Sequence, residues 1–600
     1  MRTNTRVEFG LYDVTARGDS VPTSTDARSF CDLSSDLLLD KVPALPLYGT
    51  LETRQFLMDG SYSLFPDSPS GQFWGLWSSQ LSDESGRFSS PPVLQIRFSK
   101  THSSSGLMLH FYAPTEDWAS ELTIRWYGSD GGLLTTAVFT PDAVDYYCAR
   151  KVENYLSIVL TFTATNRPGR YLKLSGLDYG KFLTFEGAEV VEAHILEEIN
   201  PLSDELSINT LNLTLFNRKG DFSILNPDGV FDVLQHKQKF TVWEDVRETT
   251  RSTEIVSHNM GTFYLSDWEN TSDTLASFTA VDAIGLLDSA PFNGGVYNTT
   301  VGNLVAEVLD GYEYELDAAL AAESISGYLP MDTRRTALQQ IAFAVGAVVD
   351  CSRSDKIKIF PAPERSSGLI TYQRKFSDGN KVTLKPLITG VSVTAHRYTA
   401  GAETEELYKD ELVAGTHQIT FSSPALADSL AVTGGTLVER GTNHCNVTVT
   451  TPGEVVVTGQ KYIETTTVLQ QTASNLPPNA QDNVLTVTDA TLVSPDRAEA
   501  LAQRILTYYA QRYEQTFRML AGTEVLADML IVESFGGEMV RGQLEKMEFD
   551  LTGGYRADVR VTGRRLSLGA DAYTGEIYAG ERSLIWCPGK FQSMTAPRRM

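Results

Sequence analysis

Histidines, cysteines and paired acids are the side chains with which this sequence could do chemistry, and their spacing defines no site. The eight histidines form no HxxH, HExxH or HxH pattern, so a local zinc-hydrolase motif is missing. The five cysteines include no CxxC pair that would hold zinc. With 75 acidic residues, almost any carboxylate pair could be put forward for glycoside hydrolysis, so such a pair is uninformative. The histidines are His102, His110, His194, His236, His258, His396, His417 and His444, and the cysteines are Cys31, Cys148, Cys351, Cys445 and Cys587.

Glycine motifs give no catalytic signal either. The sequence contains no GxSxG elbow and no Walker loop, and its Gly-Gly pairs lie between β-type runs, where hairpins need them. We therefore expect a protein that is not an enzyme, with no cofactor and no metal site.

The charge balance argues against tight binding to nucleic acid. Fifty basic and 75 acidic residues give a formal net charge of -25, which repels a phosphate backbone. An acidic surface would still suit a channel through which DNA passes without adhering.

The N-terminus lacks the apolar core of a signal peptide, and the longest apolar run, near residues 342–349, is far shorter than the roughly 20 residues of a spanning helix. We expect neither a membrane span nor signal-dependent secretion. The sparse, odd cysteine count favours free, mostly buried thiols and assembly in a reducing cytoplasm.

Six hundred residues exceed one hydrophobic core and suggest several domains. Runs such as VLQIRF, GLMLHFY and ELTIRWY, separated by turns, predict an antiparallel β sandwich. The sequence is divided into an N-terminal segment (1–46), the sandwich (47–190), a second β region (191–297), an α/β insertion (298–372), a third β region (382–566) containing an inserted β-rich domain at about 400–486 and a helix at 494–513, and a C-terminal arm (567–600) that looks irregular.

Two helices have clear start signals. Thr333 is a candidate N-cap for an apolar 3,1,3,3 pattern that runs to Val348. Ser494-Pro495-Asp496 supplies a cap, a proline at the first helical position and an acid at the positive end of the dipole. Thr552-Gly553-Gly554 predicts a hairpin turn.

The segment ELSINTLNLTLFN, residues 205–217, breaks the alternation expected of a strand. Its apolar residues first occupy even positions and then odd ones: Leu206, Ile208, Leu211, Leu213 and Leu215. A strand of period two would turn one of these sets to water. Two alternatives remain open: a β-bulge at Asn209 and Thr210 with both sets covered, or a strand that begins only at Leu211.

The order of several stretches between about residues 193 and 566 resembles the baseplate or tail-tip hub proteins of tailed bacteriophages, of the late control D type. These stretches are LSINTLNLTLFN, GTFYLSDWE, VDAIGLL, TALQQIAFAVGAVVD with KIKIF, and SPDRAEALAQRILTYY leading into GQLEKMEFDLTGGY. The resemblance implies a mainly β chain with α+β parts, in which 191–297 and 382–566 are two β-barrels.

The same resemblance implies a function. Three copies would form a ring of six barrels that adapts the six-fold tail tube to a three-fold tip and leaves a channel for DNA. It implies a homotrimer in the virion, assembled in the host cytoplasm. The implied partners are tail tube, distal tail and tape-measure proteins, and a tail fibre or host glycan.

The sandwich resembles a galactose-binding, discoidin-type jelly roll, from the order of WSSQLSD, VLQIRFS, LTIRWYGSDG and RPGRYLKLSGLDYG. Such modules often bind glycans through loops, with aromatic rings against sugar faces. The candidates for such contacts are Trp74, Trp77, Arg167 and Arg170, with core packing as the alternative for the tryptophans, including Trp126, and salt bridging as the alternative for the arginines.

Two other functions stay open. The chain could be a glycan-binding adhesin of a virion or cell surface that acts through the sandwich. It could also be a tail-associated cell-wall hydrolase, although the sequence contains no catalytic motif for one.

Overall fold

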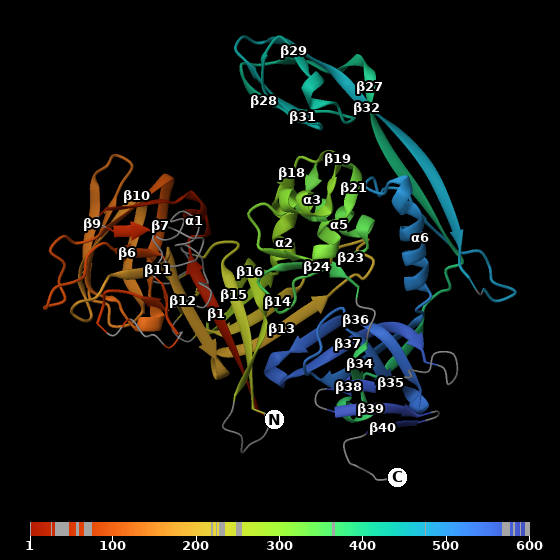
Figure 1. Ribbon diagram of the computed structural model, residues 1–600, viewed down its shortest axis with the longest axis horizontal. Helices are drawn as coiled ribbons and strands as arrows, with labels where there is room; N and C mark the ends of the chain where they lie inside the picture. Colours follow the sequence, from red (N-terminus) through yellow and green to blue (C-terminus); the bar gives the residue numbers. More distant parts are fainter. Residues whose placement is uncertain are drawn as a thin grey trace.

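The computed structural model describes a mainly β chain whose short helices are concentrated in the middle of the sequence (Figure 1). This confirms the expected mainly β class with α+β parts. Within the described ranges, no helix is both long and apolar enough to cross a membrane. The described residues are 2–25, 27–29, 47–53, 55, 59, 61–64, 75–217, 220–223, 225–226, 234–247, 255–362, 366–474, 476–566, 576–579, 582–587 and 590–593.

The largest unit is a mainly antiparallel sheet that connects 13 strands of the described chain. One strand, β25 (Ser366–Ile370), pairs with β35 (Met529–Glu533), which pairs with β36. The main strand order is β12 (Gly180–Glu186), β1 (Arg2–Tyr12), β15 (Lys239–Arg247), β16 (Val256–Ser272), β17 (Leu275–Val281), β14 (Thr210–Phe216), β13 (Val190–Glu198), β36 (Met539–Asp550), β37 (Arg556–Arg565), β34 (Tyr513–Leu520) and β26 (Lys381–Leu384).

The first strand of the chain belongs to this sheet, although the sequence was divided there as a separate segment. Val7, Phe9 and Leu11 alternate along β1 and are buried in the sheet core. β1 pairs with β12 on one edge and with β15 on the other. The N-terminus therefore ties the end of the sandwich to the sheet.

The expectation of two closed barrels was wrong for the described residues, where the sheet is one open path. A strand has only two edges, and β13 uses one for β14 and the other for β36. The strands that would close separate barrels are instead joined edge to edge. We call β1, β15, β16, β17, β14 and β13 the first half-sheet, and β36, β37, β34, β26, β35 and β25 the second half-sheet.

The broken alternation at residues 205–217 marks the start of a strand. β14 begins at Thr210 and pairs without a register shift with β17, so the bulge at Asn209 and Thr210 was wrong and the strand-start alternative is confirmed. Both apolar sets are covered, but by different cores. Leu206 lies in the core of the α/β part, whereas Leu211 lies in the core of the sheet.

The α/β part lies next to the large sheet, where α2 contacts β16 and β17 (Figure 1). Thr333 accepts a hydrogen bond from the Thr336 amide and caps α5, as predicted, but the helix ends at Val345 because Gly346 turns the backbone to a φ of +79°. Proline at the first position of α6 is also confirmed. The elements are α2 (Ala283–Leu286), β18 (Pro291–Phe292), β19 (Gly295–Thr300), α3 (Val301–Val308), β20 (Tyr314–Leu316), α4 (Ala318–Ala321), β21 (Ser324–Leu329), β22 (Asp332–Thr333), α5 (Arg334–Val345), β23 (Ala347–Asp350), β24 (Ile357–Pro361) and α6 (Pro495–Tyr509).

The sandwich region is a second sheet with its own core. Its long strand β7 contains both of the runs VLQIRF and GLMLHFY, and Trp126 is fully buried, which confirms the core alternative for that residue. The strand order is β3 (Ala27–Ser29), β6 (Leu76–Ser78), β11 (Lys173–Asp178), β7 (Val93–Phe111), β10 (Asp145–Thr165), β8 (Ala119–Tyr127) and β9 (Leu133–Phe139), with β2 (Val21–Thr25) paired to β7 and α1 (Val14–Asp19) packed on it.

A long two-stranded ribbon ends in a small β tip (Figure 1). Asn443 in the tip donates to the carbonyl oxygens of Asn293 (2.7 Å) and Leu329 (3.1 Å), so the tip also contacts the α/β part. The ribbon is β27 (Gly390–Leu412) with β32 (Gly453–Thr472), flanked by β33 (Val484–Val487), and the tip adds β28 (Gly415–Thr420), β29 (Ala431–Thr433), β30 (Thr436–Arg440) and β31 (His444–Val449). Where the sequence looked irregular, the described residues form β38 (Glu576–Ala579), β39 (Arg582–Cys587) and β40 (Lys590–Ser593).

Candidate functional site

The two half-sheets meet where β13 pairs with β36, from His194 opposite Asp550 to Glu198 opposite Lys546. The pairing continues past the strand, because the Ile199 amide donates to the Glu545 carbonyl at 2.9 Å. We call this pairing the seam. It is made of backbone hydrogen bonds, which hold the two half-sheets in one register.

One ion pair is buried beneath the seam. Arg353 Nε lies 3.3 Å from Glu197 Oε1, and the Arg353 guanidinium lies over the ring of Phe549 at 5.2 Å. Burial raises the pKa of Glu197 although Arg353 opposes that effect. Such a pair contributes little net stability, but loss of one partner would leave a charge buried alone.

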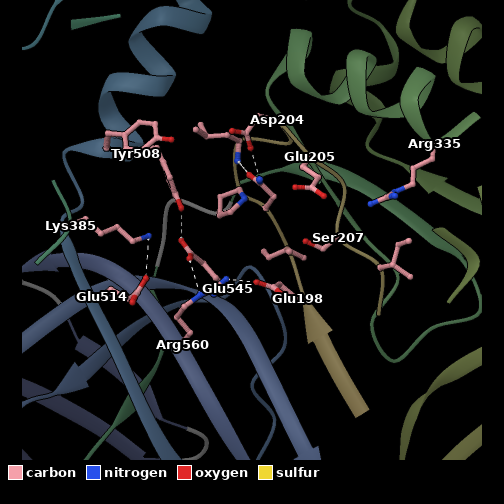
Figure 2. Close-up of a pocket in the computed structure, with 16 residues that line it drawn as sticks. Glu198, Asp204, Glu205, Ser207, Arg335, Lys385, Tyr508, Glu514, Glu545 and Arg560 are labelled. Carbon is pink, nitrogen blue, oxygen red and sulfur yellow. Dashed lines mark hydrogen bonds and ion pairs between the residues drawn. The ribbon is translucent and has the colours of Figure 1, made fainter. Parts of the chain in front are cut away.

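A cavity of about 490 Å³ opens beside the seam. Figure 2 shows that α6, the loop at residues 199–208 and the strands of the second half-sheet converge on it. Half of its lining residues are charged: Glu198, Asp204, Glu205, Glu514 and Glu545, with Arg335, Lys385 and Arg560.

Glu545 is the most deeply buried acid of this lining. Tyr508 Oη donates to its Oε1 at 3.0 Å, and Arg560 Nε lies 3.5 Å from its Oε2 (Figure 2). Arg560 also pairs with Glu198 at 2.5 Å. Burial raises the pKa of Glu545, although nearby cations such as Lys385 lower it. The Glu545 carboxylate on β36 therefore connects to α6 through Tyr508, and it connects to Glu198 on β13 through Arg560.

The loop at residues 199–208 is held by side chains from the helices. The Ser203 hydroxyl donates to the Ala347 carbonyl at 2.8 Å, which fixes the loop to β23. Three further side chains donate to loop carbonyls: Arg335 to Leu206, Gln339 to Ser203 at 2.7 Å, and Arg504 to Leu202 at 3.1 Å.

The side chains that line the cavity connect structural elements to one another. Among the residues that the structure describes, its lining contains no histidine and no cysteine. Across the part of the chain that the structure describes, no group of three or more histidine, cysteine or acidic side chains could hold a metal ion. Glu198, Glu514 and Glu545 are instead paired with cations or tyrosine, which stabilises the contact between sheet and helix.

The structure brings three of the four glycan-binding candidates together. Trp77 lies in β6 with 1% of its surface exposed, so its ring is part of the interior. Arg167 and Arg170 both approach Asp117, at 2.5 Å and 3.5 Å. Trp74 lies outside the described residues.

Two charged residues of this cluster, Lys173 and Glu52, were not predicted from the sequence. Lys173 lies in the apolar strand of RYLKLSGLD, and a lysine inside such a run is a sign of a buried partner. Its Nζ lies 2.8 Å from Asp117 Oδ2 and 2.8 Å from Glu52 Oε2. Glu52 comes from a segment without any pattern, so the sequence could not have placed it here.

Comparison with known proteins gives structural similarity only. No family model and no curated protein matches the chain. Solved structures that are similar to it include a tail protein from Neisseria meningitidis (9% identity, 63% of this chain and 93% of that chain, TM-score 0.38), a 43 kDa prophage tail protein from Shewanella oneidensis (10%, 63% and 94%, 0.35) and a prophage tail protein from Listeria monocytogenes (8%, 64% and 93%, 0.37).

Proposed function

We propose that this chain is the structural hub of a phage tail tip or baseplate, and that three copies form a ring below the tail tube. The observation that carries the proposal is the seam, which joins two half-sheets edge to edge within one chain. Three copies would present six half-sheets, which matches a six-fold tube to a three-fold tip. The partners would be tail tube, distal tail and tape-measure proteins, with the assembly formed in the host cytoplasm and carried in the virion.

The contact between copies would use an edge of the large sheet. β26 pairs only with β34 among the described strands, so its other edge offers unpaired backbone groups. Val382 and Leu384 on this strand are 38% and 55% exposed, which adds apolar surface. Obligate interfaces of this kind bury roughly 2,000–5,000 Å².

The net charge of -25 supports a channel for DNA. A negative lumen would repel the phosphate backbone and let double-stranded DNA pass without tight binding. A lumen lined mainly by lysine and arginine would contradict this part of the proposal.

A structural role accounts for the pairing of charges in the cavity beside the seam, where each buried acid meets a cation or a tyrosine. The alternative of a cell-wall hydrolase predicts loss of turbidity when the purified chain is added to Gram-positive cell walls, and we expect none. The adhesin alternative concerns the sandwich alone and is compatible with a hub role for the rest of the chain.

Native mass spectrometry of the purified full chain tests the proposal. The expected mass is three times 66.1 kDa. A mass of 66.1 kDa at every concentration, or of a dimer, would overturn it.

A further inference from the structure

Four members of the charged cluster in the sandwich are closed to solvent: Glu52, Asp117, Arg170 and Lys173. Lys173 is 1% exposed, and its Nζ lies between Asp117 Oδ2 and Glu52 Oε2, at 2.8 Å from each. The same ammonium lies 5.0 Å from the ring of Trp77 and 5.5 Å from that of Tyr112. Burial is the largest single effect and raises the pKa of Asp117, but Lys173, Thr115 and Arg170 together outweigh it and lower that pKa.

Cations outnumber the acids that belong to the sandwich itself. Two buried cations, Arg170 and Lys173, contact Asp117 as their one carboxylate from the loops and strands of that unit. Arg167 also pairs with Asp117, but its side chain is 43% exposed. A buried cation without a counter-ion is costly. This place therefore requires one more anion, and Glu52 supplies it.

Glu52 differs from the other members in its origin. It lies on the segment 47–53, which is outside the sandwich sheet and whose strand β4 (Tyr48–Gly49) pairs over only two residues with β5 (Ser63–Leu64). Its Oε1 accepts the Tyr171 amide at 3.0 Å, so its carboxylate receives both a cation and a backbone donor. This is the way in which proteins bind the carboxylate of a ligand.

Glu52 satisfies the cluster incompletely. Arg170 is 9% exposed, and its Nη1 is buried without a hydrogen-bond partner in the part of the chain that the structure describes. That nitrogen lies 4.0 Å from Glu52 Oε1, which is beyond hydrogen-bond distance. A slightly larger or differently placed anion would engage it.

We propose that Lys173, Arg170 and the Tyr171 amide form a binding site for a carboxylate-bearing sugar, and that Glu52 fills this site in the resting chain as an internal substitute. A sugar acid matches the surroundings because it offers a carboxylate to the cations, hydroxyls to Asp117 and Thr115, and a C–H face to the aromatic rings of Tyr112 and Tyr171. Ligand entry requires Glu52 to leave. The inference is independent of the hub role.

Isothermal titration calorimetry on the full chain tests this site with glucuronate as the probe. Glu52→Ala should bind glucuronate roughly ten-fold more tightly than the native chain, because the internal competitor is gone. Galactose should bind neither, since it lacks the carboxylate. The matched control is Glu121→Ala, which removes an exposed sandwich glutamate paired with Arg87 and should behave as the native chain.

Two outcomes would overturn the proposal. Equal glucuronate affinity in Glu52→Ala, Glu121→Ala and native protein would make Glu52 a purely structural ion partner. Equal binding of glucuronate, acetate and a glutamate-containing tripeptide to Glu52→Ala would exclude a site for sugars. If Glu52→Ala does not fold, Glu52→Gln keeps the side-chain volume. Glucuronate should then raise the melting temperature of Glu52→Gln by more than it raises that of Glu121→Ala. Equal rises in the two variants would equally refute the site.

Discussion

Asn209 and Asp282 are joined by two hydrogen bonds, each donated by a backbone amide. The Asn209 amide donates to Asp282 Oδ2 at 3.1 Å, and the Asp282 amide donates to the Asn209 carbonyl at 3.0 Å. Both residues are buried where β14 begins and β17 ends, and Asp282 also caps α2. The pair therefore marks the boundary between the sheet core and the α/β core.

Replacing Asn209 with alanine should destabilise the protein by about 1–3 kcal/mol, the range for buried polar groups left without partners. The side chain accepts the Glu198 amide at 2.9 Å and donates to the Ser352 hydroxyl at 3.1 Å, and both bonds would be lost. Chemical denaturation measures the effect. Asn212→Ala, at an exposed position of the adjoining strand β14, should cost much less; equal losses of stability in the two variants would contradict the role given to Asn209.

The stability of the sandwich should fall as the pH rises from about 6.5 to 9. Burial lowers the pKa of His110, but its hydrogen bonds to Asp145 (2.7 Å) and Asp178 (3.0 Å) outweigh burial and raise the pKa to about 9. A folded-state pKa above the unfolded value gives stability that is complete below pH 6.5 and lost as the pH passes 9. Melting temperatures across this range should decrease in the native chain and stay flatter in His110→Gln. Parallel curves would contradict the assignment.

Replacing Glu244 with glutamine should stabilise the protein at pH 8. Burial raises the pKa of this carboxyl to about 7, against the hydrogen bond that Thr5 donates at 2.8 Å. An acid whose folded pKa is raised loses stability as the pH rises from its unfolded pKa of 4.5, and the loss is complete above about pH 7, at roughly 1–3 kcal/mol for a shift of this size. The gain should disappear near pH 4.5. The exposed Glu192→Gln serves as the control, and a gain of the same size in both variants would count against the burial effect.

Lysine at Val382 and Leu384 should break the contact between copies without unfolding the chain. Both side chains are exposed on the edge strand β26, and charged residues on an edge oppose strand pairing. Native mass spectrometry should report monomers for the double variant and trimers for the native chain. Val413→Lys, in the tip and more exposed at 67%, should remain trimeric; a trimer from the β26 variant would place the contact elsewhere.

Local signals in the sequence predicted local structure well. The cap at Thr333 and the proline start of α6 are where the sequence predicted them, and Thr552-Gly553-Gly554 connects β36 to β37. These features depend on neighbouring residues, whose hydrogen bonds and backbone preferences are visible in a short stretch.

Long-range pairing was beyond the sequence. β1 pairs with β15 across more than 200 residues, and no local pattern encodes the choice of edge. For the same reason the sequence predicted two closed barrels and not the pairing of β13 with β36. The carboxylate of Glu52 reaches Lys173 through the fold alone, whereas Arg167, Arg170 and Trp77 could be named as candidates from their residue types; their binding to a sugar stays a prediction.

The most direct test of the central claim is an averaged electron cryomicroscopy view of the purified assembly along its symmetry axis. The hub account predicts a three-fold ring in which six half-sheets, two from each chain, surround an open channel. A single chain, or a ring of any other symmetry, would contradict it.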